Sequence, residues 1–132
     1  MLTKSFAFLD PSHLTPELID RIRSLADACT DLRINGAVPE ALLQSAPKLD
    51  GYFPVVTPQG LRLIGEVSGH PLLPGQGRRI ITSQLWLADP NDRWVRTLSR
   101  FYRLGRAADY NHARTWFRDP FDDLDWSAGG HA

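Results

Sequence analysis

The feature that most constrains the fold is a change in the spacing of apolar residues near position 50. Between residues 16 and 34, apolar side chains recur every three or four positions, which is the period of a helix with one buried face. From residue 52 onward, apolar and polar residues alternate between turn signals, which is typical of strands joined by hairpins. Helices followed by a run of strands predict an α+β fold.

The first predicted helix, residues 16–34, is marked at both ends. Thr15 and Pro16 are typical of a helix start, and Gly36 is typical of the residue just past a helix end. We expect Cys29 to be a small core residue, because it continues the apolar stripe of this helix. The other members of the stripe are Leu18, Ile22, Leu25 and Leu32. Residues 1–14 are expected to form an extended arm, and residues 39–46 a second, short helix.

The predicted strands cover residues 52–56, 61–67, 79–88 and 93–104. Pro54 cannot donate a ladder hydrogen bond, so it predicts that the first of them is an edge strand. Gly65 suggests a bulge or a close approach of another backbone segment. Residues 93–104 also fit a helix with one arginine-rich face. We prefer the strand, because Val, Thr and aromatic residues favour pleated surfaces.

These elements predict one α+β domain over residues 1–132. An N-terminal helical hairpin (1–50) is expected to pack on a small antiparallel sheet (51–106) of SH3-like or partly open barrel form. A short C-terminal helix at about 109–118 and an acidic tail complete residues 107–132. The single cysteine cannot form an internal disulfide, and no apolar run approaches the ~18–20 residues of a membrane span. With no sign of a signal peptide, we expect a cytoplasmic protein without a membrane partner.

A net charge of zero conceals a strong segregation of charge along the chain. Residues 1–60 carry a net charge of −2, residues 61–106 carry +5, and residues 107–132 carry −3. All eight basic residues of the middle segment are arginines, and aromatic residues lie between them. Arginines and exposed rings together are what single-strand nucleic-acid binding uses. The predicted binding residues are Arg79, Trp94, Arg96, Arg100, Tyr102, Arg103 and Arg106.

The alternative is a solvated face whose arginines pair with nearby acids while the rings fill the core. Residues 119–126 raise a related choice, because they alternate acidic with large apolar side chains. Their composition resembles the acidic tails of single-strand DNA-binding proteins, although here the motif does not end the chain. They either cover the protein's own core and arginines or dock in a groove of a partner. The predicted docking residues are Phe121, Asp122, Asp123 and Trp126.

No catalytic motif, phosphate loop or metal-ligand spacing occurs in the chain. His70 is the one candidate general base, and its alternative role is to shape a Gly-His-Pro turn. We therefore expect a non-enzymatic binding or regulatory protein without metal or cofactor, whose partner is nucleic acid, preferably single-stranded. The alternative function is a protein-interaction module, such as an anti-CRISPR-like inhibitor of a host or defence complex. It would act through the arginine surface or the tail.

Three segments carry a resemblance to a known group of proteins. They are residues 65–71 (GEVSGHP), 80–85 (IITSQL) and 95–105 (VRTLSRFYRLG). They resemble a family of small uncharacterised bacterial proteins that is common in alphaproteobacteria and their plasmids and prophages. The resemblance covers roughly residues 14–106 and is specific in these three segments. It implies a small β-sheet module with an accessory or mobile-element role, and it carries no assigned activity.

Overall fold

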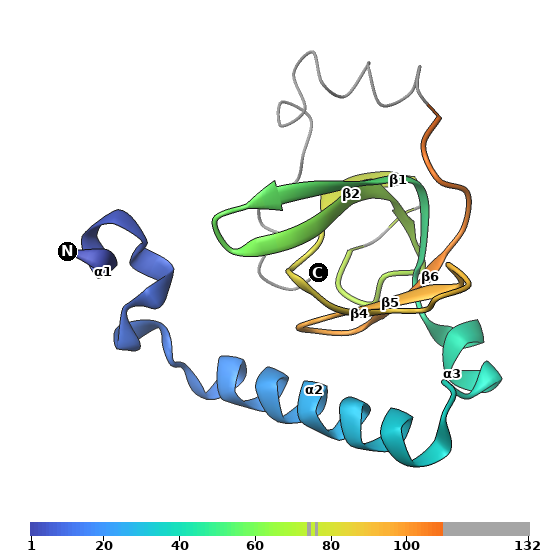
Figure 1. The fold of residues 1–132 in the computed structure, drawn as a ribbon. Coiled ribbons are helices and arrows are strands. Elements are labelled where there is room, and N and C mark those ends of the chain that lie inside the picture. The colour runs from blue at the N-terminus through green and yellow to red at the C-terminus, as the bar shows by residue number, and fades with distance from the viewer. Residues whose placement is uncertain (74, 76, 110–132) are drawn as a thin grey trace.

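In a computed structural model of the protein, helices precede a curled sheet, as an α+β fold requires (Figure 1). The structure describes residues 1–73, 75 and 77–109. The longest helix, α2 (Pro16–Asn35), confirms the first predicted helix. The N–H of Leu18 donates to the Thr15 hydroxyl at 3.2 Å, and Gly36 has the left-handed φ of 74° that ends the helix.

The apolar stripe of α2 is less buried than its spacing predicted. Leu25 is the buried residue of the helix, whereas Ile22 is 45% exposed and Cys29 is also exposed. The prediction that Cys29 lies in the core is therefore wrong. Ala28 and Leu32 are the residues in this part of α2 that pack against the sheet, so the packed face of the helix passes beside Cys29. The N-terminal half of α2 extends beyond the sheet in Figure 1, where Ile22 is exposed.

The first fourteen residues are not an extended arm. They form three short helical turns, α1 (Leu2–Ser5), η1 (Ala7–Leu9) and η2 (Pro11–His13), none of which contains a buried residue. The Asp10 carboxylate accepts from the N–H of Ser12 at 2.9 Å, which starts the last of these turns. After α2, helix α3 (Glu40–Ser45) confirms the second predicted helix.

Within the described residues, the sheet has six strands in the order β3-β2-β1-β6-β5-β4. β1 (Lys48–Thr57) lies between β2 (Gly60–Ser68) and β6 (Phe101–Leu104), so the prediction of an edge strand is wrong. Pro54 is tolerated because the ladder to β6 involves only Lys48 and Leu49, at the start of β1. That pair of strands is parallel, and the sheet is therefore mixed and not fully antiparallel as expected.

Two predicted strands are each divided in two. The segment 79–88 becomes β3 (Arg78–Ile81) and β4 (Leu85–Ala88), which form the two edges of the sheet. Only three residues join these edges, so the sheet curls until its edges approach, yet β3 and β4 are not paired and the sheet stays open. The segment 93–104 is strand and not helix, as preferred. It is a hairpin of β5 (Trp94–Thr97) and β6.

The curled sheet encloses the main core, and the helices cover part of its outer face. Leu49, Val67, Ile80 and Tyr102 are buried inside the curl. On the outer face, Leu43 of α3 and the half-buried side of α2 pack against the strands β5 and β6. This second contact positions α2 beside the β5–β6 hairpin.

Candidate binding site

Two of the aromatic residues predicted to bind nucleic acid are buried. Trp94 is 8% exposed and packs with Leu43 and Phe101, and Tyr102 is 0% exposed inside the sheet. A ring stacks on a base only if one of its faces is open to solvent. The expected stacking role is therefore wrong for Trp94 and Tyr102. In the described part of the chain the exposed tryptophan is Trp86 on β4, at 54%.

The predicted arginines occupy several places in the fold. Arg79 is on the edge strand β3, Arg96 on β5 and Arg103 on β6. Arg100 lies in the β5–β6 turn, and Arg106 follows β6 and is exposed. Because Arg96 is 5% exposed, these residues do not make up the single open face that the sequence suggested. The structure does bring Arg96 and Arg100 within electrostatic reach of each other.

A third arginine joins this pair from helix α2. Nε and Nη2 of Arg21 both donate to Oγ of Ser99, in the β5–β6 turn, over 2.9 and 2.6 Å. One turn further along α2, Oγ of Ser24 accepts from Nη2 of Arg96 at 3.3 Å. We call Arg21, Arg96 and Arg100, together with these two serines, the arginine cluster.

The positive charges of the arginine cluster repel one another. Burial lowers the pKa of Arg21, and the charge of Arg100 lowers it further. Burial also lowers the pKa of Arg96, to which Arg100 again contributes. Among the described residues, the side-chain hydrogen bonds of Arg21 and Arg96 go to hydroxyl groups and not to carboxylates. Guanidinium groups stay protonated in proteins, so the positive charges of Arg21 and Arg96 favour the binding of an anion.

Arg96 is the most buried member of the cluster. Its guanidinium carbon lies 5.0 Å from the centroid of the Phe101 ring, which provides a cation–π contact. Its Nε has no hydrogen-bond partner within the described ranges. A buried donor without an acceptor costs free energy of folding.

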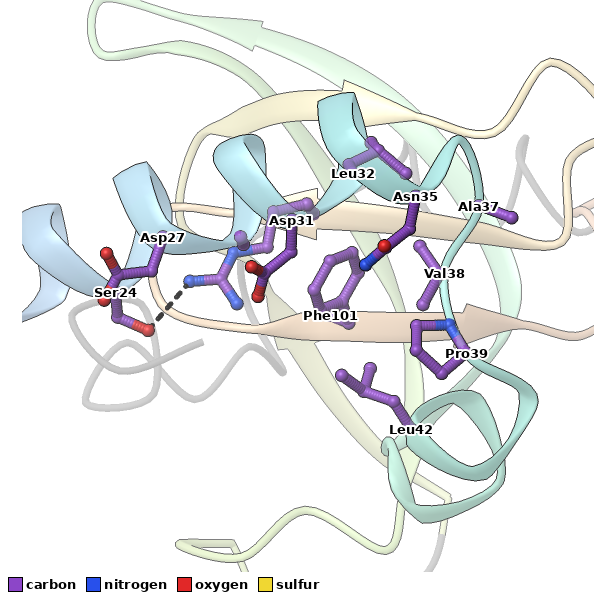
Figure 2. A pocket seen from close by; sticks show the side chains of 12 residues that line it. Ser24, Asp27, Asp31, Leu32, Asn35, Ala37, Val38, Pro39, Leu42 and Phe101 are labelled. Carbon is purple, nitrogen blue, oxygen red and sulfur yellow. Dashed lines mark hydrogen bonds between the residues drawn. The ribbon is translucent and has the colours of Figure 1, made fainter.

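A pocket of about 290 Å³ lies between α2 and the β5–β6 hairpin, beside the arginine cluster (Figure 2). Its volume is at the lower end of the range found for small-ligand sites. The wall on α2 carries polar side chains, and the wall on the α2–α3 connection, α3 and β6 is apolar. The polar residues are Ser24, Asp27, Asp31 and Asn35. The apolar residues include Val38, Pro39, Leu42 and Phe101.

Sequence reasoning missed Arg21 and the polar wall of this pocket. In the sequence, Arg21 is one of several charged residues on a helix face that is ordinarily solvated. Its contact with Ser99 joins positions 78 residues apart, which no local pattern predicts. The available signal was the recurrence of Ser24, Asp27 and Asp31 at helical spacing, on the side of α2 that carries Leu25 and Leu32.

The remaining sequence predictions concern His70, metal ligands, membrane-spanning segments and the C-terminal tail. His70 is buried, and its Nδ1 accepts from the N–H of Leu72 at 3.0 Å, which is the turn-shaping arrangement. In the ranges that the structure describes, no three His, Cys, Asp or Glu side chains come together as metal ligands would. No helix there is both long and apolar enough to cross a membrane. The tail residues Phe121, Asp122, Asp123 and Trp126 lie outside the described residues, as does almost all of the helix predicted at 109–118.

Comparison with known proteins places the chain in a family without an assigned activity. The model of a family described as "Family of unknown function (DUF6634)" matches residues 18–116, and the chain therefore belongs to that family. Searches of curated proteins and of solved structures gave no match. The family assignment agrees with the expected uncharacterised domain family, and α2 from its third residue onward, α3 and the whole sheet lie within the matched residues.

Proposed function

We propose that this member of the DUF6634 family is a non-enzymatic binding protein that holds the phosphates of single-stranded nucleic acid at its arginine cluster. One observation carries the proposal. Arg21 and Arg96 lie close to Arg100, and in the described part of the chain they donate to the hydroxyls of Ser99 and Ser24, so their charges are not neutralised by carboxylates.

The chemistry of the cluster suits phosphate oxygens. A guanidinium presents several N–H donors in a plane and binds phosphate in a bidentate manner, which an ammonium group cannot do. Hydroxyl groups such as that of Ser99 add further phosphate contacts in nucleic-acid complexes. An anion placed here would also relieve the mutual repulsion of the three guanidinium groups.

A single strand fits this surface better than a duplex. Duplex recognition usually inserts a helix with basic and amide side chains into the major groove. The exposed side of α2 carries acids as well as arginines, as in the Asp20–Arg23 pair at 3.8 Å, so it lacks the required basic face. A compact cluster beside a pocket is suited to a flexible strand whose bases can turn away from one another.

The test is the salt dependence of binding to a labelled oligothymidylate of about 12 nucleotides, followed by fluorescence anisotropy. Phosphate contacts of Arg21 and Arg96 predict that log K falls with log salt with a slope of about −1.4 between roughly 50 and 200 mM. Arg21→Gln is expected to reduce that slope by about 0.7, because one contact is lost. Arg23→Gln is the matched control, since its side chain is exposed and pairs with Asp20 on the same helix.

Absence of binding at about 50 mM salt would overturn the proposed function. Equal losses in the Arg21 and Arg23 variants would show that overall charge matters and not the cluster. Thermal unfolding of each variant separates a lost phosphate contact from a lost fold. The accessory or mobile-element role and the inhibitor alternative stay predictions from the sequence.

A further inference from the structure

The pocket beside the arginine cluster has a row of polar groups along one wall. Ser24, Asp27, Asp31 and Asn35 line it from α2 (Figure 2). These four side chains are exposed and lie beside the residues of α2 that pack toward the sheet, which are Leu25, Ala28 and Leu32. The polar groups are therefore open to a ligand that enters the pocket between α2 and the β5–β6 hairpin.

The donors and acceptors in the pocket are separated in a way that defines a complementary ligand. Arg96 contributes donors only, and its buried Nε lacks an acceptor among the described residues. Asp27 and Asp31 contribute acceptors only, and neither forms an ion pair with Arg96. A ligand must therefore present acceptors toward Arg96 and donors toward the carboxylates. Its body must be flat or apolar to fit against Phe101, Val38 and Leu42.

Guanine has this pattern of groups on one planar ring system. O6 and N7 accept together from a guanidinium, which is the commonest specific contact between arginine and a base. N1–H and the exocyclic N2 amino group lie next to O6 and donate side by side, as one carboxylate requires. Adenine places an amino donor where guanine has O6, and this donor would face the donors of Arg96.

We propose that the pocket between α2 and the β5–β6 hairpin binds a guanine base at Arg96, and that the phosphate of this nucleotide lies at Arg21, the member of the arginine cluster outside the pocket. The inference rests on the proposed function, because the cluster supplies the phosphate contact. Ser24 connects the two parts, since it lines the pocket and accepts from Arg96. The guanine comes either from a nucleic-acid strand, as an unstacked base, or from a free guanine nucleotide.

The experiment compares oligothymidylates that carry one central guanine, adenine, cytosine or hypoxanthine, at about 50 mM salt. Guanine is expected to bind about tenfold more tightly than adenine, which is the effect of one good bidentate base contact. Hypoxanthine lacks the N2 amino group and is expected to fall between them. The measured quantity is the ratio of guanine to adenine affinity, because removing any acid raises the affinity for every strand.

Three single variants test whether the acids of the pocket wall determine the preference for guanine over adenine. Asp27→Asn and Asp31→Asn change exposed residues of the pocket wall, and at least one of them is expected to reduce the ratio clearly, while the contact of Arg96 with O6 and N7 preserves part of it. Asp20→Asn is the matched control, with the same change of charge on the same helix but outside the pocket. It is expected to keep the full ratio. Equal ratios in all three variants would overturn the assignment of the pocket.

Separate outcomes distinguish this inference from the proposed function. Strands that bind without regard to the central base would overturn the guanine pocket and leave the phosphate site intact. If no strand binds but guanosine monophosphate binds in calorimetry more tightly than adenosine monophosphate, the pocket stands and its ligand is a free nucleotide. If neither the strands nor the mononucleotides bind, both the proposed function and the inference fail.

Discussion

At the scale of single residues, the hydroxyl of Tyr102 is the most informative group in the core. The side chain is 0% exposed, and its oxygen has no hydrogen-bond partner among the described residues. Burial raises the pKa of Tyr102 well above its ordinary value, although the charge of Arg100 acts in the opposite direction. In the unfolded chain, the same tyrosine ionises near pH 10.

This difference in pKa predicts how stability depends on pH. Above about pH 10 the unfolded chain releases a proton that the folded protein retains, so the free energy of unfolding falls by about 1.4 kcal/mol per pH unit. Tyr102→Phe should remove this loss. At pH 7 it should be neutral or stabilising by up to about 1 kcal/mol, because an unpaired buried hydroxyl is removed. Urea unfolding of both proteins at pH 7 and pH 10.5 tests this. A variant that is strongly destabilised at pH 7 would mean that the hydroxyl has a partner.

Gly65 is a residue whose structural role could be recognised from the sequence. A Cβ atom at this position would lie 2.9 Å from Cγ of Leu49 and 3.1 Å from the backbone oxygen of Asp50. The predicted close approach to another backbone segment is thus confirmed. Gly65→Ala should destabilise the protein by about 1–3 kcal/mol through overpacking. Its cost should shrink in a Leu49→Ala background, which a double-mutant cycle by urea unfolding measures. Purely additive effects would contradict the steric explanation.

At the scale of elements, prediction succeeded where local signals set the structure. The start and end of α2 follow from Thr15, Pro16 and Gly36, and all three act within a few residues of where they stand. The turn between β5 and β6 was missed because it lacks Gly, Pro, Asn and Asp. Instead, the Thr97 hydroxyl accepts from the N–H groups of Ser99 and Arg100, both at 3.2 Å. A threonine in a strand gives no sign of this second role.

The docking of α3 on the sheet depends on one of two adjacent leucines. Leu43 is 3% exposed and packs with Trp94 and Phe101, whereas Leu42 is 39% exposed. Leu43→Ala should therefore lower the free energy of unfolding by about 2–5 kcal/mol. Leu42→Ala is the matched control, because it changes the same residue type on the same helix, and it should cost less than half as much. Equal losses in urea unfolding would mean that α3 is seated differently.

At the scale of the whole molecule, the charge pattern of the sequence pointed to two of the three arginines of the proposed site. The excess of arginine in residues 61–106 drew attention to Arg96 and Arg100, which the fold brings within electrostatic reach of each other. The third member, Arg21, comes from the acidic first segment, and the fold alone brings it to Ser99. Net charge along the chain is a sum over neighbours in sequence, whereas an anion responds to neighbours in space. This is why the fold class could be predicted while the composition of the cluster could not.

The acidic tail, residues 119–126, gives the last test of how these charges act together. We predict that its carboxylates compete with a nucleic-acid strand for the arginines of the middle segment. Replacing Asp122, Asp123 and Asp125 by asparagine should raise the affinity for a labelled oligothymidylate at about 50 mM salt. The gain should fade toward roughly 200 mM, as the Debye length shortens.

A control with the same change of charge decides whether the tail acts by contact or only through net charge. It replaces acids of the first segment, in the variant Asp10→Asn, Glu17→Gln and Asp20→Asn. If the tail occupies the arginines, its three substitutions must raise the affinity clearly more than the control does. Equal gains would show that a strand senses the total charge alone. A tail bound to the arginines would have to leave before a phosphate could bind, so its substitution would raise the affinity by more than the change of net charge alone. Equal gains would therefore mean that the tail does not occupy the arginines and that a separate partner is its expected target.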